Sequence, residues 1–303
     1  VEIASRGRLG ELTPLGHRQH RGIAERMYYN FRPVFEDGTI VTARSSNVIR
    51  CILSMTSETQ RLAELNPDLI IDTDASEADL YFTNTPLNWT AEAYSYRAGG
   101  RTAITQFNAT HIHPERLMSA LFTDPEYMAD QRQATSLMNR LWAIATNQQS
   151  LDMDFDFEDL FTIEEKYDLW QCQNVRWYQE YGPSSQTQGM MPYYQADLLR
   201  NMLDTADECI ASGKTGASLR FGHEVVLLPL ACLMELDKCG TVVDDMEALQ
   251  DQWRNYYIYP MGCNIQLILY RKADAPILVK ALLNEREVTL PVETDSFPYY
   301  LWD

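Results

Sequence analysis

The stretch at 218–236, SLRFGHEVVLLPLACLMEL, decides the fold because it predicts a strand that passes directly into a helix. A short β-rich run ends at Phe221, Gly222 permits a sharp turn, and an apolar helical segment follows His223 and Glu224. An imidazole beside a carboxylate at such a junction has two interpretations. It is either an exposed turn whose Glu favours a helix N-terminus, or a catalytic site.

A second junction of the same kind lies earlier, where a strand at 39–43 precedes a helical pattern at 48–65. In an open parallel sheet, ligands bind at the carboxyl ends of the strands, where helix N-termini attract anions. Two guanidinium groups at this junction favour phosphate. We therefore expect loops 45–47 and 222–224 to be neighbours at one end of a largely parallel sheet. The candidate substrate-binding residues are Arg44, Ser45, Ser46, Arg50 and His223.

Length and charge limit the classes of protein. A chain of 303 residues, of which 45% are hydrophobic, can bury the core of one large domain or two smaller ones. A net charge of −18 argues against nucleic acid or an anionic membrane as a partner. None of the six cysteines forms a Cys-x-x-Cys pair, so zinc is not expected. No other cofactor is expected either.

The distribution of strand-like and helical patterns along the chain predicts two parts. Residues 1–90 and 205–303 alternate strand-like and helical patterns, whereas residues 91–204 indicate a mainly helical insertion. Thr13 and Pro14 are typical of a helix N-cap and first helical residue. Further strands are expected at 68–73 and 79–86, and an antiparallel pair at 263–272 and 277–292. The later helices are expected at 115–122, 127–146, 163–180 and 195–212.

Two motifs together resemble the histidine acid phosphatases, the second branch of the histidine phosphatase superfamily. They are ARSSNVIRCILSM at 43–55 and FGHEVVLLPL at 221–230, with LTPLG at 12–16 resembling the helix start that precedes them. The Arg50–Cys51 pair and VKALLNEREVTLPV at 279–292 are similar to the multiple inositol-polyphosphate phosphatase or phytase subgroup. The resemblance implies a phosphoglycerate-mutase-like three-layer α/β domain with an inserted helical cap.

This resemblance also implies a chemistry. A phosphomonoesterase of this family works through a phosphohistidine intermediate and is periplasmic or secreted. By residue matching, Arg50 and His223 bind the phosphoryl group, Glu224 protonates the leaving oxygen, and Arg44 matches an arginine of less defined role. The family usually has Asp directly after this His, or Glu after an intervening Ala. Here Glu224 follows His223 directly, so its reach into the site differs.

The family's nucleophile lies in an Arg-His-Gly-x-Arg motif ahead of the LTPLG segment, and this sequence contains no such motif. His17, His20, His111 and His113 all lack that context, and His20 is interpreted as part of a solvated helix face. A start at Val1 is expected of a processed product or a fragment. Two hypotheses remain: a phosphatase whose nucleophile and first strand lie upstream, leaving this chain inactive, or a degenerate, non-catalytic anion-binding phosphatase.

Overall fold

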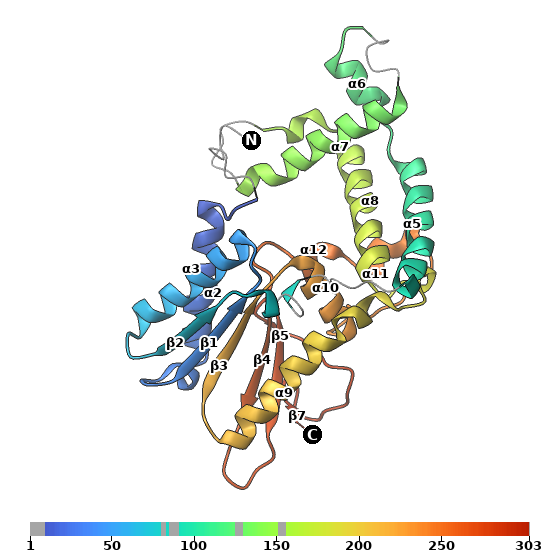
Figure 1. The fold of residues 1–303 in the computed structure, drawn as a ribbon. Helices are drawn as coiled ribbons and strands as arrows, with labels where there is room; N and C mark the ends of the chain where they lie inside the picture. The colour runs from blue at the N-terminus through green and yellow to red at the C-terminus, as the bar shows by residue number, and fades with distance from the viewer. Residues whose placement is uncertain (1–9, 80–82, 85–90, 125–129, 151–155, 303) are drawn as a thin grey trace.

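The computed structural model describes residues 10–79, 83–84, 91–124, 130–150 and 156–302. Its lower part, as drawn in Figure 1, is an α/β domain in which helices cover both faces of a parallel sheet. A helical cap rises above this domain and is formed by the middle of the chain. The expected α/β fold with an inserted cap is therefore observed.

The parallel sheet holds three strands, β1 (Ile40–Ser45), β2 (Ile70–Asp74) and β3 (Gly216–Phe221), in the order β2-β1-β3. Ser45 lies opposite Phe221, so β1 and β3 end at the same edge of the sheet. Side chains alternate across a strand, so Leu219 packs toward the first helical layer while Arg220 faces the second. The pairing places the loops after β1 and β3 side by side.

The first helical layer consists of α2 (Pro14–Asn30) and α3 (Ile49–Leu65). As predicted, α2 begins at Pro14, and the Thr13 hydroxyl accepts a hydrogen bond from the Gly16 amide. Apolar side chains of both helices pack on β1 and form one core: Ala24, Tyr28, Val41 and Leu62 are all buried. This packing fixes the first turn of α3 above the end of β1.

The second layer consists of α9 (Ala196–Ser212) and α10 (Glu224–Leu233). Leu198 of α9 packs on Val226 and Leu230 of α10. Arg220 of β3 donates hydrogen bonds to the side chain of Asn201 on α9, which joins the sheet to this layer. Because α9 is one continuous helix packed on the α/β domain, the expected boundary of the cap at residue 204 falls inside it.

An antiparallel sheet completes the α/β domain, with β5 (Leu278–Leu283) between β4 (Ile265–Tyr270) and two short strands. Those strands are β6 (Arg286–Glu287) and β7 (Tyr300–Leu301). The predicted antiparallel pair at the end of the chain is confirmed. Within the described strands, β3 pairs only with β1 and β4 only with β5, so each leaves one edge without a partner.

The described part of the cap contains the helices α5 (Ala91–His111), α6 (Glu115–Leu121), α7 (Gln131–Asn147) and α8 (Ile163–Tyr181), of which the sequence predicted α6, α7 and α8. No separate helix is predicted over α5, which falls within the segment expected to be mainly helical. The structure explains Gly99, where a Cβ would lie 2.3 Å from the backbone oxygen of Gln186. The strand expected at 79–86 lies largely outside the described residues. Within the described chain, no helix has the length and apolar character needed to cross a membrane.

Short helices connect these elements. The two α-helical ones are α11 (Leu249–Gln252) and α12 (Asn255–Ile258). The 3-10 helices are η1 (Arg32–Phe35), η2 (Glu77–Asp79), η4 (Gln148–Ser150), η5 (Glu158–Leu160), η6 (Ser185–Thr187), η7 (Met191–Gln195) and η8 (Met246–Ala248).

Candidate active site

A cleft of about 700 Å³ runs between the unpaired edges of β3 and β4. Both strand-to-helix junctions open into it, and residues from α2, α3, α9 and α10 line its walls. From the junctions come Arg50, Cys51, Gly222, His223 and Glu224. The cleft therefore lies at the carboxyl ends of β1 and β3, where an open parallel sheet binds its ligands.

The two junctions meet at His223. The Ser46 hydroxyl lies 3.2 Å from His223 Nε2, and Arg50 Nη2 lies 3.1 Å from His223 Nδ1. The Ser46 amide also donates to the Phe221 carbonyl at 3.0 Å, which continues the β1–β3 pairing into the loops. The prediction that loops 45–47 and 222–224 are neighbours is confirmed.

These contacts determine which nitrogen of His223 carries the proton. A guanidinium group can only donate hydrogen bonds, so Nδ1 of His223 must accept from Arg50. The proton of the neutral ring is therefore on Nε2, where it can point to the Ser46 hydroxyl or to an anion in the cleft. Burial lowers the pKa of His223, the nearby Arg50 charge lowers it further, and Glu224 partly opposes both effects.

Both helices that begin at the junctions lack a side-chain cap. Val48 is the N-cap of α3 and His223 that of α10, and neither side chain bonds to the first turn. Serine is a common N-cap residue, but the Ser46 hydroxyl contacts His223 and does not cap α3. Free N–H groups and two positive helix ends therefore point toward one cleft, which favours an anion.

Cys51 and Gly222 hold the second junction in place. The Cys51 thiol donates to the Gly222 carbonyl at 3.0 Å and lies 3.7 Å from Nε2 and 3.9 Å from Nδ1 of His223. Nearly equal distances to both nitrogens indicate that the sulfur packs against the ring. A Cβ at Gly222 would lie 2.4 Å from the Thr83 carbonyl oxygen, so only glycine fits this turn.

Other residues predicted for the site have different surroundings. Glu224 is exposed, is the first residue of α10 and lines the cleft. Arg44 forms an ion pair with Asp72 at 2.6 Å, and the Ser45 hydroxyl, fully buried, donates to the Ser46 carbonyl. Neither Arg44 nor Ser45 is among the described residues that line the cleft. The structure thus brings together Ser46, Arg50, His223 and Glu224, but not these two residues.

The sequence did not predict that His20 and Glu58 line the cleft. The interpretation of His20 as a solvated residue is wrong: its side chain is 17% exposed, and Nδ1 lies 2.7 Å from a carboxylate oxygen of buried Glu58. Burial raises the pKa of Glu58, although the hydrogen bond from His20 partly offsets this. Arg50, Ser54 and Glu58 follow at four-residue spacing on α3, a signal that they share one helix face.

Replacing Arg50 with alanine should raise the pKa of His223, because a nearby positive charge disfavours the imidazolium. Titration of the His223 ring signals by NMR measures this, with Arg286→Ala as a control on the exposed strand β6. Because the pKa of His223 is lowered in the folded chain, the unfolded chain binds this proton more readily. The free energy of unfolding should therefore decrease as the pH falls below about 6.5, the pKa of an unfolded histidine. An unchanged or lower pKa in Arg50→Ala would contradict the assigned geometry.

Comparison with solved structures identifies proteins of the same fold. The Bifidobacterium longum multiple inositol polyphosphate phosphatase in complex with inositol hexasulfate superposes with a TM-score of 0.75 and 21% identity, covering 96% of this chain and 78% of that one. Its complex with phosphate gives the same values. The phytase from D. castellii gives a TM-score of 0.63 at 13% identity, covering 92% of this chain and 61% of its own. No family model and no curated protein sequence matches.

The chain therefore has the α/β fold with an inserted helical cap that the sequence resemblance predicted. More particularly, the chain has the fold of the multiple inositol polyphosphate phosphatase of B. longum. Among the described residues, no group of three or more His, Cys, Asp or Glu is arranged to hold a metal ion.

Proposed function

We propose that this chain is the greater part of a phosphomonoesterase of the histidine acid phosphatase type, acting on inositol phosphates. The observation that carries the proposal is the pair of uncapped helix N-termini that converge on Arg50 and His223. Arg50 has no carboxylate within ion-pair distance among the described residues, so its guanidinium can bind an anion. A phosphoryl group is the anion that such a cradle of N–H donors and guanidinium fits best.

In the proposed reaction, Arg50 and His223 bind the phosphoryl oxygens and stabilise the charge that they carry in the transition state. A histidine nucleophile attacks phosphorus while the ester oxygen leaves with a proton from Glu224. Water then attacks the phosphohistidine and gives a proton back to the Glu224 carboxylate, and inorganic phosphate is released. Glu224 is the candidate acid because it lies in the cleft, directly after His223.

In this proposal the nucleophile comes from a segment that the 303-residue sequence does not contain, and the shape of the cleft supports an inserted strand. The unpaired edges of β3 and β4 flank the cleft, with Ser218–Phe221 on one side and Ile265 on the other. Leu230 and Met202 form an apolar wall from the second helical layer, and Ile23 does so from the first. A buried strand inserted here would pair with both edges, and its carboxyl end would lie beside His223.

The proposed substrate class rests on the solved proteins of the same fold. The B. longum enzyme is a multiple inositol polyphosphate phosphatase crystallised with inositol hexasulfate and with phosphate, and the D. castellii protein is a phytase. We extend this class of ligand to the present chain. Extracellular or periplasmic localisation is part of the same proposal.

Binding of inorganic phosphate to the purified chain tests the proposal, measured by calorimetry. We expect saturable binding that Arg50→Ala weakens at least about tenfold, since a hydrogen bond to a charged group contributes about 1.5–3 kcal/mol. Arg286→Ala, on the exposed strand β6, should leave the affinity unchanged. Absence of saturable binding, or equal loss in both variants, would refute the assignment of this cleft as a phosphate site.

A further inference from the structure

Helix α7 carries a net positive charge in an acidic protein and contains no acidic residue. The chain carries 43 Asp and Glu residues against 25 Lys and Arg, yet α7 contains no acidic residue and two arginines, Arg132 and Arg140. The acid that precedes it, Asp130, is the N-cap and accepts hydrogen bonds from the Arg132 and Gln133 amides. The body of the helix is therefore a local region of positive charge.

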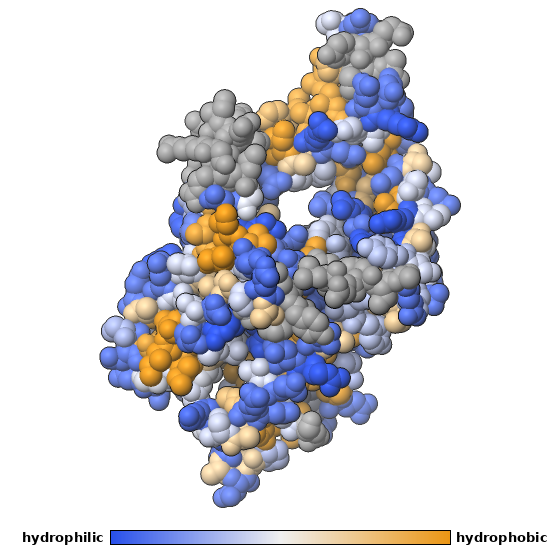
Figure 2. All heavy atoms as spheres, viewed as in Figure 1, coloured by the Kyte–Doolittle hydropathy of each residue, from blue (hydrophilic) through white to orange (hydrophobic). Residues whose placement is uncertain are grey.

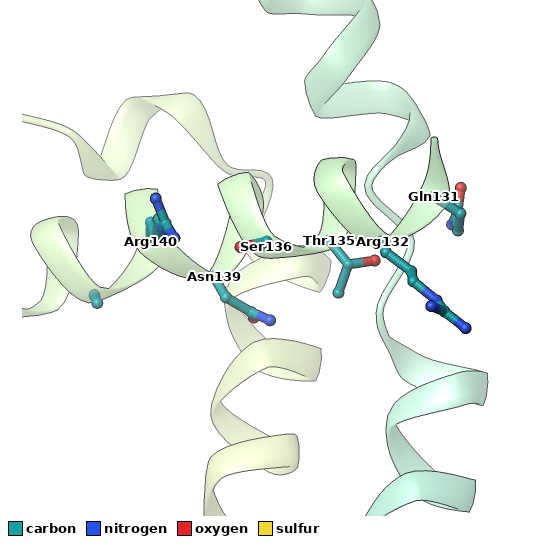
Figure 3. A pocket seen from close by; sticks show the side chains of 7 residues that line it. Gln131, Arg132, Thr135, Ser136, Asn139 and Arg140 are labelled. Carbon is teal, nitrogen blue, oxygen red and sulfur yellow. The ribbon is translucent and has the colours of Figure 1, made fainter. Parts of the chain in front are cut away.

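The two faces of α7 have different environments. Ala134, Met138 and Ala145 are buried in a core with Leu117 and Phe161. The opposite face is exposed and bounds an open hollow of about 600 Å³. In Figure 3 the side chains of Arg132, Thr135 and Asn139 project from one side of α7, toward the space between α5 and α8. The residues that line the hollow are Gln131, Arg132, Thr135, Ser136, Asn139, Arg140 and Ala143.

This face leads to the active-site cleft. Asn147, the last residue of α7, lines the cleft that contains His223, as does Ser150 just beyond it. Arg132, Ser136, Arg140 and Asn147 recur at helical spacing, so they share one face. At 1.5 Å per residue, Arg140 lies about 10 Å along the helix from Asn147. In the view of Figure 2 an opening passes through the molecule beneath this helix.

Among the described residues, the two arginines have no carboxylate partner. Arg21, Arg26 and Arg116 each form an ion pair with a glutamate, whereas within the described part of the chain neither Arg132 nor Arg140 does. An exposed guanidinium without a carboxylate partner can form bidentate hydrogen bonds with a phosphate. In a protein of net charge −18, a helix face without acidic residues repels a polyanion less than the protein's acidic surfaces do, although the Glu115 carboxylate bonds Gln131 at one end of this face.

We propose that this face of α7 binds the non-reacting phosphate groups of a multiply phosphorylated substrate, while Arg50 and His223 hold the group that reacts. The inference rests on the proposed function and assigns it a selectivity: anions with several phosphates bind through both regions, and a single phosphate binds through the cleft alone. Arg140, nearer to the cleft, contacts the bound ligand, and Arg132 adds long-range attraction that salt screens.

Calorimetric titration of the purified chain with inositol hexasulfate and, separately, with inorganic phosphate tests this inference. The double variant Arg132→Gln/Arg140→Gln should bind hexasulfate about tenfold more weakly, with a shallower salt dependence, and should bind phosphate as the wild type does. The matched control is Arg200→Gln/Arg286→Gln, which removes the same charge from exposed positions on α9 and β6. It should change neither affinity.

Three outcomes would overturn the inference: unchanged hexasulfate affinity in the α7 variant, an equal loss in the control, or no hexasulfate binding by the wild type. Failure of the proposed function has a different signature. In that case phosphate does not bind, or binds independently of Arg50, whatever happens to hexasulfate.

Discussion

A chain extended at its N-terminus by a strand with an Arg-His-Gly-x-Arg motif should hydrolyse inositol phosphates, whereas the 303-residue chain should not. The chain contains Arg50 and His223, the proposed phosphate-binding residues, but not the nucleophile motif. Loss of a covalent nucleophile costs a hydrolase on the order of 10⁶-fold in turnover. We therefore expect a difference of that order, measured as phosphate release from inositol hexakisphosphate.

The matched control for this experiment is the same extension with its histidine changed to alanine, which should fold and remain inactive. Acid-labile, base-stable phosphate attached to the active chain after a rapid quench would identify the phosphohistidine. Strong turnover by the 303-residue chain that depends on Arg50 would show that another residue is the nucleophile. An upstream sequence without the motif, together with intact phosphate binding, would favour the alternative of a non-catalytic anion-binding protein.

Glu224→Gln in the active, extended protein should slow hydrolysis of an alkyl phosphate about 10²–10⁴-fold, the usual contribution of a positioned general acid. An aryl phosphate with an acidic leaving group should be slowed far less, because its oxygen needs little protonation. Phosphate affinity should stay nearly intact, since Arg50 and His223 remain. Measurement of both rates therefore separates proton donation from substrate binding.

The alternative is that Glu224 is only a favourable charge at the start of α10. That role contributes about 0.3–1 kcal/mol to stability and predicts equal rates on both substrates. Glu115→Gln is the matched control, because Glu115 is likewise the first residue of a helix, α6, in the cap. An unchanged alkyl-to-aryl ratio in Glu224→Gln would mean that the proton comes from another group in the cleft.

Much of the fold could be predicted because it follows from interactions between near neighbours in the chain. The Thr13 cap, the helix at 163–180 and the two strand-to-helix junctions are all local patterns of side-chain size and polarity. The position of the candidate site could also be predicted from local patterns. Arg50, His223 and Glu224 stand at junctions whose carboxyl-end position follows once the strands are parallel.

Where local chemistry offered a residue two partners, only the tertiary structure decided between them. Ser46 could cap α3, yet its hydroxyl contacts His223, which is 177 residues away in the sequence. Arg44 could face the phosphate, yet it pairs with Asp72 on the neighbouring strand β2. His20 has the spacing of a surface residue but lies against buried Glu58 because α2 packs on α3.

The sequence by itself therefore determined the elements, the two junctions and the residue types that attract phosphate, since these depend on local propensity and charge. Only the tertiary structure showed the cleft between β3 and β4 and the orientation of the side chains that line it. It also showed that the end of α7 lies at this cleft. Those features arise from packing between segments far apart in the chain, and packing selects one partner among several that local chemistry permits.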